Sequence, residues 1–174
     1  MQKLTVSVAE LLGRPGLYRD ISVSEDIDNI RTALARIAGA PVSGSLRAES
    51  VMEGILVTGT VTGLVAAECA RCLRPLETDV TLEVCELFVG PGSEIPDDEA
   101  YRVAGTEIHL EPMLRDALTL ALPLNPLCRR DCKGLCPRCG ADLNAGECAC
   151  ADDTTDPRWA PLDELRARLE NQGA

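Results

Sequence analysis

The sequence predicts an α+β fold, in which an antiparallel β-sheet or meander packs with one or two helices and is followed by a C-terminal cysteine-rich zinc-knuckle module. Three observations support this prediction. Apolar and polar side chains alternate between residues 46 and 89, as in half-buried antiparallel strands. Near residue 113 the apolar period lengthens to that of a helix. Six of the nine cysteines then lie between Cys128 and Cys150, at spacings typical of zinc ligands.

These patterns divide the chain into three parts. We predict an α+β core domain with a CxxC hairpin at residues 1–127 and a zinc-binding module at residues 128–151. A polar linker and a short C-terminal helix are predicted at residues 152–174, where leucines recur at helical intervals.

Composition and charge restrict the class of protein. A chain of 174 residues with 45% hydrophobic residues is long enough for a globular core. No apolar run approaches the ~18 residues of a membrane span, and the N-terminus lacks an apolar signal core. We therefore expect a cytoplasmic protein with no membrane partner. Reduced thiols in that compartment, and an odd number of cysteines, favour metal ligation over a disulfide framework.

The N-terminal forty residues predict a short strand and a helix. Leu4, Val6 and Val8 alternate with polar residues as a strand would. Between Asp26 and Gly39, apolar residues recur at intervals of three and four, and Asp26 suits a helix N-cap. This segment is predicted to be a short amphipathic helix.

The alternating region predicts two paired strands with a CxxC motif at the turn between them. Cys69 and Cys72 fall at this hairpin tip, where a zinc knuckle offers two sulfurs to one ion. A pair of buried structural cysteines is the alternative. Cys85 lies in the body of the second strand, where we expect a small apolar packing residue. The apolar faces of the two strands carry Ile55, Val57, Val61, Val80, Leu82 and Val84.

A second helix is predicted at Met113–Leu122. Pro112 suits a first helical turn, and apolar residues follow at helical intervals. Pro123 and Pro126 end the helix and lead the chain, extended, to the cysteine-rich segment. The single histidine, His109, has no serine, cysteine or paired-carboxylate motif beside it. We expect it to pack or to lie on the surface, and we expect no catalytic residue.

The cysteine spacings predict two zinc sites of four thiolates each. The CxxC pair Cys136 and Cys139 has the CxC pair Cys148 and Cys150 as its nearest later partners, so these four close a compact site. Two pairs without local partners remain, and they complete each other if the chain after the Pro123–Pro126 segment passes beside the hairpin tip. The predicted ligands of two structural zinc ions are Cys69, Cys72, Cys128, Cys132, Cys136, Cys139, Cys148 and Cys150.

Two alternatives to this arrangement stay open. One ion bound by the four cysteines between Cys128 and Cys139 would leave Cys69 and Cys72 as a free dithiol, and it would also leave Cys148 and Cys150 without partners. An iron–sulfur cluster is the other, since four cysteines can also hold a cluster.

Six basic residues lie within a few positions of a cysteine, in a chain of net charge −11. One interpretation is an RNA-binding patch, because lysine and arginine neutralise phosphates. The other, which we favour from the sequence, is charge compensation, because Zn²⁺ with four thiolates carries a net charge of −2. The candidates for RNA binding are Arg71, Arg74, Arg129, Arg130, Lys133 and Arg138.

Five segments occur in an order that resembles a known family: residues 46–59, 69–73, 122–128, 134–140 and 156–162. Together they resemble the YceD-like family, the large ribosomal RNA subunit accumulation proteins. The resemblance implies a bacterial cytoplasmic factor with an α+β fold, a role in 23S rRNA accumulation and large-subunit assembly, and no catalytic residue. The family tolerates fewer cysteines after the Leu-Pro-Leu segment at residues 122–124, so the metal count rests on spacing.

Two classes of function follow. The favoured one is a non-enzymatic ribosome-assembly factor with structural zinc and no small-molecule substrate. Its partner would be ribosomal RNA or a precursor of the large subunit, contacted directly or through a protein. The alternative is a thiol–disulfide redox protein or redox sensor that uses Cys69 or Cys136 as nucleophile. Such a protein needs its CxxC motif at a helix N-terminus in a βαβ setting, and neither motif has that setting in the sequence.

Overall fold

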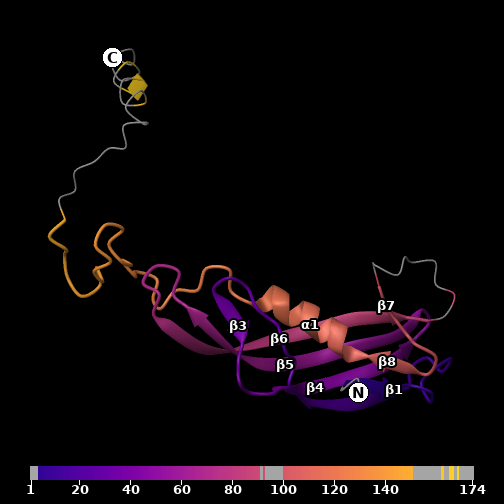
Figure 1. The fold of residues 1–174 in the computed structure, drawn as a ribbon. Helices are drawn as coiled ribbons and strands as arrows, with labels where there is room; N and C mark the ends of the chain where they lie inside the picture. The colour runs from indigo at the N-terminus through magenta and orange to yellow at the C-terminus, as the bar shows by residue number, and fades with distance from the viewer. Residues whose placement is uncertain are drawn as a thin grey trace. The chain divides into compact units, whose positions relative to one another are not determined.

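A long antiparallel hairpin is the centre of the sheet (Figure 1). Its strands, β5 (Gly54–Glu68) and β6 (Pro75–Val89), each have fifteen residues and pair without interruption over their full length. Both are rich in valine, leucine and threonine, and β-branched side chains fit the pleated surface of a sheet. The turn between them carries the first CxxC motif, as the sequence predicts.

The opposite side of β5 pairs with two strands in succession. β4 (Val42–Val51) pairs with the first nine residues of β5, and β3 (Ala35–Ile37) pairs with residues 65–67. β2 (Tyr18–Glu25) pairs with β4 and forms that edge of the sheet. β5 therefore pairs directly with three strands, β3, β4 and β6.

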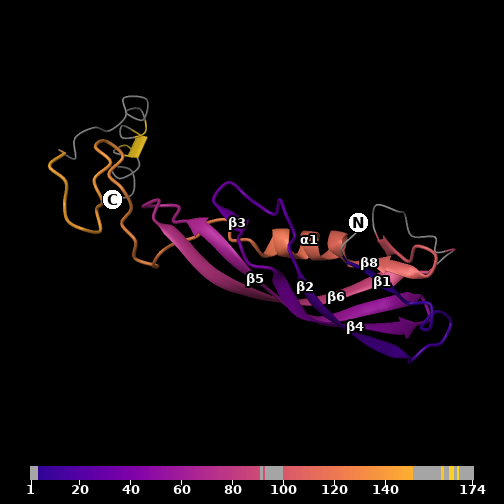
Figure 2. The ribbon, with the colours of Figure 1, turned by 60° about the horizontal axis from the view of Figure 1, so that its bottom comes forward.

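Short strands and one helix complete the sheet region. β7 (Tyr101–Arg102) runs parallel to the last two residues of β6. β1 (Thr5–Ser7) and β8 (Glu107–His109) form a separate two-stranded sheet, and α1 (Leu110–Ala121) follows β8 directly. Both views show α1 lying along one face of the large sheet (Figure 2). The helix begins three residues before the predicted Met113, so Pro112 lies within its first turn.

The core lies between α1 and the sheet. Every second residue of β5 points into it, and Ile55, Val57 and Val61 have no exposed surface. On the other face of β5, Thr62 shares a hydroxyl hydrogen bond of 2.9 Å with Thr81 of β6. The predicted period-two pattern is thus confirmed. From α1, the core receives Leu110, Met113, Leu114 and Leu118.

The predicted helix between Asp26 and Gly39 is wrong. Asn29 has a φ of 64°, which an α-helix excludes, and the segment ends in β3. Ile27 and Ile30, which suggested the helical period, are buried in the core. Tertiary packing therefore decides the conformation of this segment, because its isoleucines are buried without a helix.

The computed structural model describes residues 4–90, 92, 100–150, 162, 165, 166 and 168. The chain divides into two compact units, Met1–Cys132 and Lys133–Ala174. In its described residues the first is a mainly antiparallel sheet with one helix, which agrees with the predicted α+β class. The predicted divisions after residues 127 and 151 stay predictions, and most of the predicted C-terminal helix lies outside the described residues. None of the helices in the described part of the chain combines the length and apolarity needed to cross a membrane.

Candidate metal centres

The first CxxC pair is held in a tight turn between β5 and β6. The N–H of Cys69 donates to the carbonyl of Arg74, and the N–H of Leu73 donates to the carbonyl of Cys69, both at 2.9 Å. Leu73 has a φ of 58°, the left-handed conformation that glycine adopts most readily. The turn keeps the sulfur atoms of Cys69 and Cys72 close together.

The chain after α1 brings two more cysteines to this turn. The N–H of Ala70 donates to the carbonyl of Pro126 at 2.8 Å, so the segment before Cys128 lies beside the hairpin tip. The Sγ of Cys132 lies 3.8 Å from the Sγ of Cys69. The Sγ of Cys128 lies 3.7 Å from that of Cys72. All four sulfur atoms lie within 4.8 Å of one another and form the first cysteine group.

These sulfur distances fit one tetrahedral ion. Four Zn–S bonds of about 2.3 Å give sulfur–sulfur edges of about 3.8 Å, close to the values observed. A disulfide would need about 2.05 Å, and all the cysteines are free. In a four-iron cluster each cysteine binds a different iron, so the four cysteine sulfurs lie farther apart than they do around a single ion. Thiolate ligands in a tetrahedral arrangement suit zinc.

The second cysteine group repeats the same turn within the second unit. It contains Cys136, Cys139, Cys148 and Cys150, whose sulfur atoms also lie within 4.8 Å of one another. The N–H of Cys136 donates to the carbonyl of Ala141 at 2.8 Å, and the N–H of Gly140 donates to the carbonyl of Cys136 at 2.9 Å. Gly140, with a φ of 73°, stands where the first turn has Leu73.

The second unit has almost no apolar core among its described residues. Only Gly134 and Cys136 are buried there, and polar contacts connect the loops. The side-chain oxygen of Asn144 accepts the N–H of Lys133 at 2.8 Å, and Asp142 accepts the N–H of Asn144 at 2.9 Å. Such a small unit needs a metal or cross-links to remain folded, because it buries too little surface.

Without a cation, the thiols of each group cannot all ionise. Burial, together with the neighbouring thiols, raises the pKa of Cys128 to about 12. In contrast, the backbone N–H groups of Cys128 and Cys72 lower the pKa of Cys69 to about 6. In the second group, the backbone N–H of Cys139 lowers the pKa of Cys136 to about 6. One thiolate is thus favoured in each group, and a divalent cation would stabilise the other three.

Cys85 lies outside both groups, and the prediction that it packs as an apolar residue is wrong. Its side chain is exposed on β6, opposite Thr58 of β5. Alternation correctly predicts the strand here. Val84 and Phe88 of β6 are buried and lie on the opposite face of the strand from Cys85, so Cys85 is on the face that α1 leaves uncovered.

The exposure of Cys85 predicts a simple thiol titration. In metal-loaded native protein we expect one rapidly reacting thiol per chain, since ligated thiolates react slowly. With chelator and denaturant, all nine cysteines should react. Cys85→Ser should abolish the rapid phase without changing the metal content. Rapid reaction of several thiols in the metal-loaded protein would contradict the assignment.

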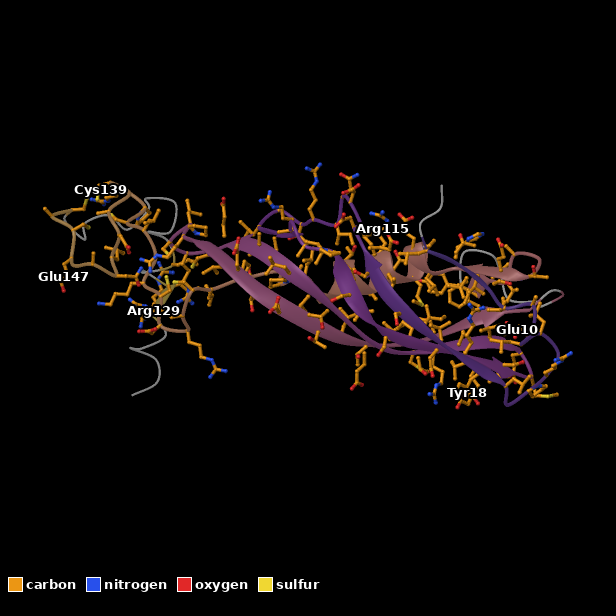
Figure 3. All side chains as sticks on the ribbon, turned by 90° about the horizontal axis from the view of Figure 1, so that it is seen from below. Glu10, Tyr18, Arg115, Arg129, Cys139 and Glu147 are labelled. Carbon is orange, nitrogen blue, oxygen red and sulfur yellow. The ribbon has the colours of Figure 1, made fainter. Side chains whose placement is uncertain are left out.

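The six predicted basic residues are all exposed, and they divide between the two units. Arg71 Nη1 donates to the carbonyl of Cys132 at 2.7 Å, which places its positive charge beside the first cysteine group. Arg129 lies 3.5 Å from the carboxylate of Asp131 (Figure 3). Arg71 therefore suits charge compensation, and RNA binding stays a prediction. The first unit contains Arg71, Arg74, Arg129 and Arg130, and the second contains Lys133 and Arg138.

Sequence reasoning missed another pair of basic residues. Arg31 and Arg36 are partners in an isolated antiparallel bridge and line a hollow of about 350 Å³ beside β5 and β6. Glu68 and Glu77 line the same hollow, so carboxylates already lie near the two arginines. The sequence predicts a helix over this segment, so it does not indicate that Arg31 and Arg36 lie opposite each other in a β-bridge.

Comparison with known proteins gives a family and several relatives. Residues 57–166 match the family described as large ribosomal RNA subunit accumulation protein YceD. An uncharacterised protein of Mycobacterium tuberculosis is 43% identical over 169 residues, which cover 93% of this chain and 81% of that protein. An uncharacterised protein of Bacillus subtilis is 24% identical over 142 residues, which cover 80% of this chain and 81% of the Bacillus protein.

A plant relative has a descriptive name. The chloroplastic large ribosomal RNA subunit accumulation protein YCED homolog 1 of Arabidopsis thaliana is 33% identical over 66 residues. The match covers 38% of this chain and 21% of the plant protein. No solved structure matches the chain.

Proposed function

The chain belongs to the YceD family of large ribosomal RNA subunit accumulation proteins, and from this membership we propose that it is a non-enzymatic cytoplasmic factor for 23S rRNA accumulation and large-subunit assembly. The observation that carries the proposal is the family match over residues 57–166, which includes both cysteine groups. The name of the plant relative supports the same role in ribosomal RNA accumulation. The resemblance predicted from the five ordered segments is confirmed.

In this proposal the two cysteine groups hold structural zinc. The first would join the β5–β6 turn to the segment after α1, and the second would hold the loops of the small unit together. The sulfur distances of 3.7 and 3.8 Å support the first assignment. Zinc ligation in sites closed by four thiolates leaves no position for a substrate, so the metal would act through structure.

A redox function is less well supported. A pKa of about 6 at Cys69 and Cys136 is what a nucleophilic thiol needs. However, Cys69 has no exposed surface and Cys136 is 6% exposed, whereas a reactive thiol must meet its substrate. Each of these cysteines also has three other sulfurs within 4.8 Å. Metal ligation accounts for both the crowding and the burial.

The function is tested by measuring 23S rRNA relative to 16S rRNA in a host that lacks this protein. We expect the ratio to fall and to be restored by the wild-type chain and by the exposed-site control Cys85→Ser. The variant Cys69→Ser/Cys72→Ser should not restore it, because the first unit would be destabilised. An unchanged ratio in the deletion host would contradict the proposed function.

The partner within this process is tested with the four basic residues of the first unit. If they bind RNA, changing Arg71, Arg74, Arg129 and Arg130 to glutamate should weaken binding to 23S rRNA fragments. The slope of log affinity against log salt should then become shallower by about 3, because four phosphate contacts are lost. The control Arg14→Glu changes an exposed arginine far from these positions in the sequence.

Zinc content and unfolding free energy must be unchanged in these variants for the comparison to hold. Full RNA association together with a full 23S rRNA level would mean that the arginines only compensate charge. A protein partner would then be the proposed contact.

A further inference from the structure

The outer edge of β6 is a long strand edge with no partner strand among the residues that the structure describes. In the sheet order, β6 is followed only by β7, which pairs with Phe88 and Val89 alone. Within the described part of the chain, residues 75–87 therefore pair on one side only, with β5. A strand paired on one side exposes the N–H and C=O groups of alternate residues, and these groups can accept a further strand.

This edge lacks several features that usually prevent strand pairing. Proline occurs only at its first position, Pro75, and no lysine or arginine occurs between residues 75 and 89. The register with β5 runs from Gly54↔Val89 to Glu68↔Pro75 without a bulge. Proteins commonly protect such edges by short length, lysine, proline or bulges. An uninterrupted edge of thirteen residues, 75–87, is longer than the usual strand of about 5–6 residues.

Acidic side chains give this edge its charge. Glu77, Asp79 and Glu83 are exposed and share one face of β6, because strand side chains alternate. The structure gives none of these three described carboxylates an ion-pair partner. Close like charges repel, so a partner with cationic side chains would be favoured. At the opposite edge of the sheet, Asp20 of β2 is paired with Arg47 at 2.8 Å.

We propose that residues 75–87 of β6 bind an extended segment of a partner protein that is rich in lysine and arginine, by addition of a strand to the sheet. Main-chain hydrogen bonds to the free edge would provide affinity, and the acidic face would select a basic sequence. The inference rests on the strand edge and its charges, and it depends neither on zinc nor on the proposed role in 23S rRNA accumulation.

The test uses the full metal-loaded chain and a fluorescent synthetic peptide that alternates lysine with valine. We expect saturable binding by anisotropy and slower amide hydrogen exchange within residues 75–87. Two further peptides carry methyl groups on alternate backbone nitrogens, one peptide for each of the two alternating sets. The peptide whose methyl groups lie on the edge that pairs with β6 should bind about tenfold more weakly. Glu77→Lys/Asp79→Lys/Glu83→Lys should weaken binding of the unmodified peptide about tenfold.

A matched variant separates this edge from the general negative charge of the chain. Asp26→Lys/Glu53→Lys/Glu147→Lys changes the net charge equally at exposed positions outside β6 and should retain most of the binding. Equal loss in both triple variants would overturn the proposal, since binding would then follow net charge alone. Unchanged binding of both methylated peptides, no binding of the unmodified peptide, or slower exchange only outside β6 would also overturn it.

Discussion

Replacing Cys69 and Cys72 by serine is expected to reduce zinc from two ions to one per chain and to destabilise the whole first unit. The two sulfurs tie the β5–β6 turn to the segment that follows α1, and without them only Cys128 and Cys132 remain near the site. Because metal binding free energy contributes to folding, we expect the unfolding free energy to fall by about 3 kcal/mol or more. Elemental analysis of reductant-treated protein and urea denaturation measure the two effects.

The matched variant for this experiment is Cys136→Ser/Cys139→Ser. It should also lose one zinc, but it should loosen only the second unit, since the two cysteine groups share no residue. The competing arrangement, with one ion between Cys128 and Cys139, predicts no zinc loss in the Cys69→Ser/Cys72→Ser variant. One zinc in both the wild type and that variant would refute the two-site assignment.

The substitution Gly59→Ala is expected to destabilise the sheet strongly. A Cβ atom at Gly59 would lie 2.2 Å from the carbonyl oxygen of Ser45 and 2.8 Å from the Cα of Leu46, both backbone atoms of β4. Gly59 also has a φ of +147°, which other residues rarely adopt. The central strands β4 and β5 would have to separate, so we expect a loss of about 3 kcal/mol in the free energy of unfolding.

Gly63→Ala is the control in the same strand. Its Cβ atom would have Ile37 Cδ1 at 3.5 Å and Leu118 Cδ2 at 3.6 Å as nearest neighbours, which are ordinary contacts. We expect its unfolding free energy to stay within about 1 kcal/mol of the wild type. Urea denaturation of metal-saturated protein compares the two variants. Equal losses would show that the close approach of β4 to Gly59 does not limit stability.

Several features of this protein were predictable from the sequence because they depend on neighbouring residues. Alternation between residues 46 and 89 predicted the strands, and the helical period after Pro112 predicted α1. The four cysteines of the second group lie within fifteen residues, so their spacing alone indicates that they meet. The five ordered segments also identified the family, which the match over residues 57–166 confirms.

Other features depended on contacts between distant residues. Ile27 and Ile30 have a helical spacing but are buried without a helix. The alternation of apolar and polar residues predicts β6, but it does not indicate that the face of β6 with Cys85 is exposed. The local repeats and the short cysteine spacings can be read from the sequence alone, because they involve neighbouring residues. Three features depend instead on packing between elements far apart in the chain: the contact of the Pro126 carbonyl with the N–H of Ala70, the closure of the first cysteine group, and the edge of β6 that lacks a described partner.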